Sequence, residues 1–527
     1  MLRTAFPSLC LTLAVASLAP AQQWRDDAHA RIDMHRKSDF TVRVVDTAGS
    51  LVPDAQVRVE MQEHAFRFGT AVSARQLTDN TPDGSLYRQK LLENFNEVVF
   101  ENDLKWPPTI GLWGNTNFSP AITNNALDWL EANALPARGH YLSWATWSGT
   151  DAWGNAPYSS GQGPLTASQS QLLRTDLFDR ITDIATTIGD RVYEWDVINH
   201  PVGWLNDTYE DAGRLGPGIY SDIVDHASTV VPEGTDLWIN EDNIIAGGSL
   251  ANEYERVIQD LIDAGSPVDG IGFQAHFIEE WGRVSSSSPQ QVYERIDRFD
   301  ELVPRLRVTE FDIDVGSDEA LQAQLMTDYL TAMFSHENIE AVTMWGFWAG
   351  RHWRGENGAL YRQDWSEKPS LVAYQDLVFD EWWTDEAGTS DAGGLFDTRA
   401  FDGTYDVTVT FDGADYVVSG FSLTEDATLE VVVNSTTILC GDFNGDGTVD
   451  LLDLDLLGAN FGRTDATFSQ GDANGDGTVD LLDLDILGAE FSNTLPAAIP
   501  EPTTLVMLAT LVLPTVGRSR QLANRGG

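Results

Sequence analysis

The sequence predicts an α/β protein built around a (β/α)8 TIM barrel, which is flanked by small β-rich modules and followed by a small α-helical repeat domain. Three observations support this organisation. Short apolar runs alternate with amphipathic stretches over about residues 67–380, a pattern typical of parallel α/β folds and long enough for eight strand–helix units. Segments 24–66 and 381–438 alternate polar and apolar residues as strands do. Residues 441–453 recur as 471–483, which indicates an internal repeat.

Residues 1–21 are predicted to form an export signal. Arg3 precedes an apolar run, and Ala19-Pro20-Ala21 provides a cleavage pattern. A buried first helix is the alternative. Export would place the mature chain outside the cell or at its surface. Cys10 would be removed and Cys440 would remain alone, so no intramolecular disulfide could form. The formal net charge of −49 argues against a nucleic-acid partner.

The two β-rich modules flank the barrel in the sequence. Residues 24–66 contain the alternating runs 40–45 and 55–61 around a turn, and they predict an N-terminal β module. Residues 381–438 contain the alternating run 405–411, followed by Asp412-Gly413, a hairpin signal. They predict a second β module.

Eight apolar runs are predicted to be the barrel strands. They are Phe66–Val72, Glu97–Phe100, Ala137–Leu142, Tyr193–Ile198, Asp236–Ile239, Gly270–Phe273, Leu306–Val308 and Ala341–Met344. The amphipathic stretches 172–188 and 252–264 are typical of the intervening helices. Because parallel barrel strands end on one face, polar residues that follow the strands are expected to be neighbours in space.

The residues after the strand ends combine carboxylate, amide, Lys, His and Trp side chains. This mixture suits hydroxyl-rich rings, which need hydrogen bonds at their edges and stacking on their faces. The stretches are 101–106, 138–144, 199–200, 240–243, 274–276 and 310–312, followed by Trp345 and Trp353.

This series resembles glycoside hydrolase family 10, the family of endo-β-1,4-xylanases. The motifs Glu-Asn-x-x-Lys-Trp, Arg-Gly-His-x-x-x-Trp, Trp-Asp-Val-x-Asn, Gln-x-His and Thr-Glu-x-Asp occur in that order. The resemblance implies a secreted retaining hydrolase that cleaves internal β-1,4 links of xylan without a catalytic cofactor. It implies that Glu310 is the nucleophile, that His276 hydrogen-bonds Glu310, and that Asp312 orients His276. The substrate-binding residues that it implies are Glu101, Asn102, Lys105, His140, Trp144, Asn199, Gln274, Trp345 and Trp353.

The sequence departs from the family at the catalytic acid/base. The family has Glu directly after the Asn of its third motif, whereas this chain has His200. In one reading His200 transfers the proton, since imidazole titrates near neutral pH. In a second reading a loop carboxylate substitutes, with Asp207, Glu210, Glu279 and Glu280 as candidates. In a third, the barrel binds xylan or a β-glucan and cleaves it weakly or not at all.

The repeat over residues 439–493 has the spacing of calcium-binding loops. Oxygen ligands stand at positions 1, 3, 5, 7, 9 and 12, and Gly stands at position 6 for the sharp turn. The expected ligands are Asp442, Asn444, Asp446, Thr448, Asp450 and Asp453 in the first loop and Asp472, Asn474, Asp476, Thr478, Asp480 and Asp483 in the second, the Thr residues through their carbonyls. Two structural Ca2+ sites are therefore predicted.

Each of these loops runs into one apolar helix, an arrangement that resembles a type I dockerin. The resemblance implies a cohesin-type scaffold as a candidate partner. The sequence departs from the family at loop positions 10 and 11, where Leu451-Leu452 and Leu481-Leu482 replace a small polar or charged pair.

Residues 497–527 are predicted to be a sorting segment. Pro500-Glu501-Pro502 precedes an apolar run over 505–516 and a basic tail. This order resembles PEP-CTERM signals, which implies a sorting protease of the exosortase type and transient anchorage in the inner membrane. A weak anchor or a packed terminal helix is the alternative reading.

Overall fold

The computed structural model describes residues 11–114, 116–145, 165–203, 208–210, 214–434 and 439–491. The chain divides into two compact units. The first comprises the chain up to Val44 and Val52–Val431, and the second comprises Val45–Leu51 and the chain from Val432 onward. The predicted sorting segment lies outside the described residues. Within the described part of the chain, no helix has the length and apolar character needed to cross a membrane.

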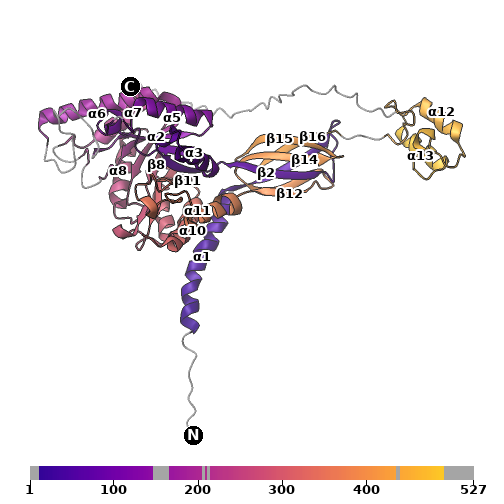
Figure 1. The fold of residues 1–527 in the computed structure, drawn as a ribbon. Coiled ribbons are helices and arrows are strands. Elements are labelled where there is room, and N and C mark those ends of the chain that lie inside the picture. Colours follow the sequence, from indigo (N-terminus) through magenta and orange to yellow (C-terminus); the bar gives the residue numbers. More distant parts are fainter. Residues whose placement is uncertain are drawn as a thin grey trace, which may run out of the picture. The chain divides into compact units, whose positions relative to one another are not determined.

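Eight parallel strands close into the predicted barrel (Figure 1). They are β3 (Arg67–Val72), β4 (Glu97–Phe100), β5 (Ala137–Ser143), β6 (Glu194–Asn199), β7 (Asp236–Glu241), β8 (Gly270–Phe273), β10 (Leu306–Asp314) and β11 (Ile339–Met344). Pairing of β11 with β3 completes the closure. A short strand, β9 (His276–Ile278), runs beside the end of β10. The predicted fold class and all eight predicted strands are confirmed.

Helices follow the barrel strands. They are α2 (Ala74–Leu77), α3 (Pro82–Asn94), α4 (Trp106–Thr109), α5 (Pro120–Ala132), α6 (Ala167–Ile188), α7 (Ile219–Val230), α8 (Ala251–Ala264), α9 (Pro289–Asp297), α10 (Glu319–Phe334) and α11 (Pro369–Asp376). Shorter helical turns are η3 (Gly189–Arg191), η4 (Glu279–Trp281), η5 (Gly355–Asn357) and η6 (Leu377–Glu381). A capping box between Thr166 and Gln169 starts α6. Such caps position the loops that precede the helices.

The two predicted β modules form one sandwich. In one sheet β1 (Lys37–Asp46) lies between β13 (Leu395–Phe401) and β16 (Ala427–Val433). The other sheet has the order β12 (Asp385–Thr389), β2 (Gln56–His64), β14 (Gly403–Phe411) and β15 (Ala414–Leu423). Phe40 joins the sheets, with its ring centroid 5.7 Å from that of Tyr405 and stacked at 5.0 Å on Phe421. The expectation of two separate modules is therefore corrected: an isolated hairpin cannot bury its apolar face, so the two segments pair.

The beginning of the predicted N-terminal module is also corrected. Residues 24–35 belong to α1 (Leu11–His35) rather than to a strand. Arg25 forms a 2.7 Å ion pair with Asp328 on α10, and Ala28 and Ile32, four residues apart, are buried. This spacing has the helical period, and the sandwich begins only at β1.

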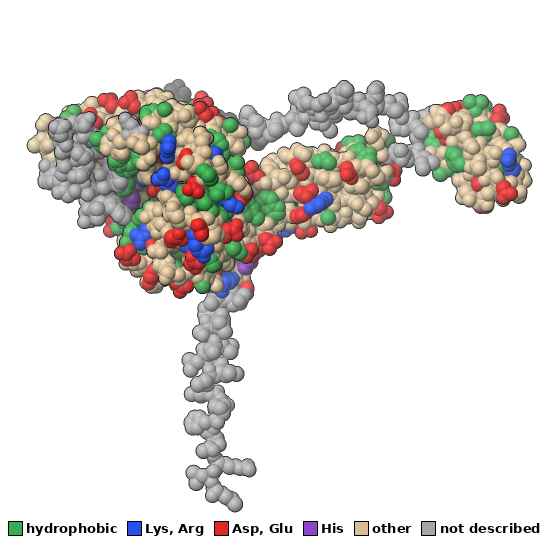
Figure 2. Space-filling model, viewed as in Figure 1, with side chains coloured by type: hydrophobic (Ala, Val, Ile, Leu, Met, Phe, Trp, Pro, Cys, Tyr) green, Lys and Arg blue, Asp and Glu red, His purple; other side chains and the backbone are tan. Residues whose placement is uncertain are grey.

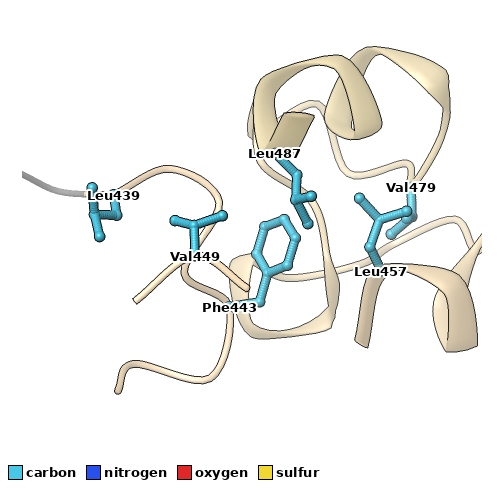
Figure 3. Packing of buried hydrophobic residues seen from close by; sticks show 6 residues of the cluster. All are labelled: Leu439, Phe443, Val449, Leu457, Val479 and Leu487. Atoms are coloured by element: carbon cyan, nitrogen blue, oxygen red, sulfur yellow. The ribbon is translucent and has the colours of Figure 1, made fainter. Parts of the chain in front are cut away.

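The second unit contains the repeat. Helix α12 (Leu451–Asn460) follows the first loop, the turn η7 (Phe468–Gln470) follows α12, and α13 (Leu481–Glu490) follows the second loop. Figure 3 shows their shared core, which consists of Leu439, Phe443, Val449, Leu457, Val479 and Leu487. Both copies contribute equivalent residues to this core, Val449 and Val479 from the loops and Leu457 and Leu487 from the helices. Neither copy could bury this surface alone.

Acidic side chains are spread over the face of the protein shown in Figure 2, where Lys and Arg side chains are fewer. The excess of Asp and Glu is thus distributed over the surface of that face.

Candidate active site

Glu310 lies on β10, and its carboxylate is buried among donors. Oε1 accepts a 2.9 Å hydrogen bond from Asn240 Nδ2, and Oε2 lies 3.3 Å from His276 Nε2. Burial alone would raise the pKa of Glu310, but the hydrogen bond from His276 and the charges of His276 and Lys105 outweigh it and hold the pKa below its usual value. Glu310 is therefore ionised at neutral pH, as a nucleophile must be.

His276 connects Glu310 to a second carboxylate. Its Nδ1 lies 2.9 Å from Asp312 Oδ1, while the other Asp312 oxygen accepts a 2.6 Å hydrogen bond from Trp353 Nε1. Burial disfavours the imidazolium, but Asp312 and Glu310 together raise the pKa of His276 to about 10. A positive charge therefore stays beside Glu310 throughout the neutral range.

A chain of amides runs from Glu310 to His200. Thr309 Oγ1 donates to Asn240 Oδ1 at 2.6 Å, so the Asn240 amide nitrogen faces Glu310 and also donates to Asn199 Oδ1 at 3.0 Å. Gln274 Nε2 donates to the same Asn199 oxygen at 3.1 Å and lies 3.0 Å from His200 Nε2. Each donor fixes the orientation of the next amide, so His200 Nε2 is the acceptor at the end of the chain.

His200 follows β6 and is buried. Its Nδ1 lies 2.9 Å from Glu241 Oε1, and its ring centroid lies 4.7 Å from that of Trp144 at an interplanar angle of 30°. Its φ of 54° is left-handed, a conformation that non-glycine residues rarely adopt outside functional or turn positions. Two hydrogen bonds and the tilted contact with the Trp144 ring thus hold the imidazole.

The remaining predicted binding residues include a group that lies around the Trp345 ring. Lys105 Nζ donates to Asn102 Oδ1 at 3.0 Å and lies 5.8 Å from the Trp345 ring centroid. The His140 ring is 5.2 Å from Trp345, and its Nδ1 is 2.8 Å from the buried Asp196 carboxylate. Burial, together with the nearby charge of Glu310, raises the pKa of the Glu101 carboxyl. Charged and amide groups are thereby set around an aromatic face, as sugar binding requires.

Comparison with known families assigns this arrangement. The model of "Glycosyl hydrolase family 10" matches residues 58–377, more than half of the chain. The chain belongs to glycosyl hydrolase family 10. The model of the "Dockerin type I domain" matches residues 440–492, the segment that carries the repeat.

Several relatives of this family 10 chain align over the barrel. It is 28% identical over 398 residues to "Anti-sigma-I factor RsgI6" of Acetivibrio thermocellus, covering 74% of this chain and 47% of that protein. It is 26% identical over 436 residues to "Endo-1,4-beta-xylanase 1" of Arabidopsis thaliana, covering 81% and 42%. The chain therefore spans less than half the length of these two relatives. The crystal structure of xylanase 10B from Thermotoga petrophila RKU-1 with xylobiose matches with a TM-score of 0.50 and 20% identity, covering 60% of this chain and 95% of that one, which shows the common fold.

The loop carboxylates considered as substitutes for the family's acid/base Glu are engaged elsewhere. Glu279 accepts from the Ser285 backbone N–H at 2.9 Å, and Glu280 pairs with Arg354 at 3.1 Å. Glu210 pairs with Arg256 on α8 at 3.3 Å. Asp207 lies outside the described residues. No described contact joins Glu210, Glu279 or Glu280 to Glu310.

Two site residues were not assigned a role from the sequence. Asn240 and Glu241 end β7, and they hold Glu310 and His200 respectively. Their position after a predicted strand was the available signal. The family motifs quoted above did not include them, so only the geometry reveals that they contact the two key side chains.

The repeat loops of this family 10 chain fit a hard cation. Gly447 and Gly477, at position 6, have φ of 85° and 84°, which suits the sharp turn. At position 12, Asp453 and Asp483 are buried, and each accepts hydrogen bonds from backbone N–H groups of its own loop, which draws the loop around that carboxylate.

The fit of the loops rests on their oxygen donors and their shape. All expected ligands are carboxylate, amide or carbonyl oxygens, which Ca2+ prefers. In the described part of the chain, no three Asp, Glu, His or Cys side chains converge as a ready-made metal site. Type I dockerin domains bind calcium, and the donor set of each loop agrees with that.

Proposed function

We propose that this protein is an exported retaining glycoside hydrolase that cleaves internal β-1,4 links of xylan, with Glu310 as nucleophile and His200 as the proton-transfer group. The observation that carries the proposal is the ionised Glu310 held between Asn240 and the His276–Asp312 pair. A protein that only binds sugar has no need of a carboxylate activated in this way.

The reaction would proceed in two steps. In the first, Glu310 forms a bond to the anomeric carbon while the glycosidic bond breaks, and His200 gives a proton to the leaving oxygen. In the second, a water molecule bonds to the anomeric carbon, its proton passes to His200, and Glu310 leaves as a carboxylate. His276 keeps a positive charge beside Glu310 throughout, and Asn199, which accepts a hydrogen bond from Asn240, would meet the sugar 2-hydroxyl.

Reducing-sugar release from xylan between pH 4 and 9 tests the proposal, with Glu310→Gln as the blank. We expect release that disappears in the blank. Release by the blank equal to that of the natural protein would refute Glu310 as nucleophile, and no release by either would refute the hydrolase.

A second candidate is a xylan- or β-glucan-binding protein with weak or no hydrolysis. It is favoured by the hydrogen bond that His200 Nε2 already accepts from Gln274, which leaves no proton on that nitrogen for a leaving group. An aryl β-xyloside with an acidic leaving group separates the two candidates, because its departure needs no proton. Rapid formation of a covalent sugar ester on Glu310 supports the enzyme, whereas binding without an ester supports the binding protein.

The dockerin domain extends the proposal to a partner. We propose that each loop holds one structural Ca2+ through the six ligands given above and that the domain docks on a cohesin-type scaffold outside the cell. The exposed Leu451-Leu452 and Leu481-Leu482 pairs would favour a scaffold with an apolar surface. A pull-down with a cohesin in calcium and in excess chelator tests this: binding in both or in neither would refute it. Export through residues 1–21 and sorting through residues 497–527 by an exosortase-type protease complete the proposal, and the mass of the mature chain tests both.

A further inference from the structure

Glu241 is a buried carboxylate whose contacts all lie at the acid/base position. Its side chain is fully buried at the end of β7. Oε1 accepts from His200 Nδ1 at 2.9 Å and from the Asp242 backbone N–H at 2.8 Å, and Oε2 accepts from the Val202 backbone N–H at 2.8 Å. These bonds hold the carboxylate against His200 and against the backbone two residues after it. Stability alone does not explain why a charged group should be buried at this point.

We infer that Glu241 is the positioning residue of a His200–Glu241 pair that replaces the family's acid/base carboxylate. The inference rests on the proposed function. The Glu241 carboxylate contacts Nδ1, the ring nitrogen on the opposite side from Nε2. Glu241 therefore holds the proton on Nδ1, so that Nε2 is the nitrogen that exchanges protons with substrate. A carboxylate in this place selects the tautomer and stabilises the imidazolium formed during the reaction.

The direction of the amide chain gives the same tautomer independently. Gln274 donates its amide N–H to His200 Nε2, and Gln274 is itself oriented by Asn199. A neutral imidazole that accepts at Nε2 must carry its proton on Nδ1, which is the nitrogen that faces Glu241. Two sets of contacts, from β7 and from the end of β8, therefore agree on one tautomer.

The cycle of the pair conserves protons. His200 Nε2 takes a proton from solvent when Gln274 releases it, and passes that proton to the leaving oxygen as the glycosidic bond breaks. Nε2 then receives a proton from the attacking water and returns it to solvent when the hydrogen bond from Gln274 forms again. Glu241 stays an ionised carboxylate and takes up no proton during the cycle. Its role is to pair with the imidazolium between these events.

Several charged groups surround the pair. Asp242, next to Glu241, is neutralised by Arg283, which donates to both of its oxygens at 2.7 Å. Tyr220 donates to the Pro201 carbonyl beside His200, and Trp144 covers the ring face. Since Arg283 already balances Asp242, Glu241 is the carboxylate that directly balances a charge on His200.

The variant Glu241→Gln tests the inference, with Glu210→Gln as the matched control that removes a carboxylate outside the site. On aryl xylobiosides we expect Glu241→Gln to keep its rate with the most acidic phenols and to lose 100-fold or more with alkyl or sugar leaving groups. We also expect the alkaline limb of its pH profile on xylan to move to lower pH, since the imidazolium loses its partner. The Glu210→Gln control should match the natural protein in both respects.

Two outcomes would separate this inference from the proposed function. A natural protein that is active, together with a Glu241→Gln variant that shows the same dependence on leaving group and pH, overturns the role of Glu241 and leaves the hydrolase standing. A natural protein without activity on any of these substrates overturns the proposed function instead.

A measurement on the natural protein covers the case in which Glu241→Gln does not fold. Nitrogen NMR of histidine-labelled protein, with His200→Gln to assign the signal, reports the tautomer. A proton on Nδ1 at neutral pH supports the pair, and a neutral ring with its proton on Nε2 overturns it.

Discussion

The charge on His276 depends on Asp312, and the variant Asp312→Asn tests how much of the activation of Glu310 comes from that pair. The asparagine keeps the size of the side chain and can still accept one hydrogen bond. It removes the negative charge that lies 2.9 Å from His276 Nδ1. His276 then loses much of what keeps it protonated in a buried place.

The structure gives the magnitude. A pKa of about 10 for His276 against an ordinary 6.5 corresponds to about 5 kcal/mol in favour of the imidazolium. Asp312 makes the largest favourable contribution, through both its charge and its hydrogen bond, and it offsets the burial that disfavours the imidazolium. In the variant the pKa of His276 falls toward its ordinary value and the pKa of Glu310 rises. Loss of a charge-assisted hydrogen bond to Glu310, the proposed nucleophile, should lower kcat/KM about 10- to 100-fold at pH 7.

The assay is kcat/KM on an aryl xylobioside between pH 4 and 9. We expect the acid limb, which reports the ionisation of Glu310, to move to higher pH. Trp353→Phe is the control, because it removes the other hydrogen bond to Asp312 and leaves the charge in place. An acid limb that stays in place in Asp312→Asn, or moves equally in both variants, would refute the reasoning.

Thermal unfolding gives a second readout of the Asp312→Asn variant. A raised pKa means that folded His276 keeps a proton that the unfolded chain releases. Its contribution to stability is therefore complete below pH 6.5 and is lost as the pH rises to about 10. The variant should thus lose more stability at pH 6 than at pH 10, and an equal loss at both values would contradict the linkage.

Three further predictions concern stability. Burial raises the pKa of Asp103 to about 7, so this group destabilises the fold as the pH rises from about 4 to 7. Asp103→Asn should therefore add roughly 2–4 kcal/mol to the free energy of unfolding at pH 8 and little at pH 4, as measured by urea titration. Burial lowers the pKa of His64 and of His352 to about 4, so between pH 6.5 and pH 4 both side chains take up protons when the chain unfolds. Tm should therefore fall as the pH is lowered from 6.5 to 4, and it should fall less steeply in His64→Phe. Chelation of calcium should unfold the repeat domain, as measured by calorimetry. Replacement of the buried Asp453 by Asn should weaken the stabilisation by calcium, whereas replacement of the exposed Asp455 by Asn should not, and a domain indifferent to chelator would overturn the metal assignment.

The barrel could be predicted because its signals are local. Each strand is a short apolar run bounded by polar residues, and the predicted run 97–100 has the same limits as β4. Convergence of strand ends then brings Glu310, Asp312 and His276 near one another without any knowledge of side-chain positions. The hydrogen bonds among them follow from that placement.

The sandwich could not be predicted in the same way. Alternation identifies β2 and β14 as strands, but it carries no information about which strand pairs with which. The pairing depends on shared burial of Phe40, Tyr405 and their neighbours, which are far apart in the sequence. Similarly, the role of Glu241 depends on which way one side chain points, and a strand end alone does not specify that.

The sandwich also has a consequence for how the protein is made. Roughly 320 residues separate the end of β2 from the start of β12, its partner in the sheet. At about 5–20 residues per second, synthesis leaves β1 and β2 without their neighbours for roughly 15 to 65 seconds. During that time both edges of β1 and both edges of β2 are available to any other chain nearby. Translation that stops while the barrel segment is being made, or a truncation placed just after α11, would therefore release a protein in which β1 and β2 can pair with strands of another chain.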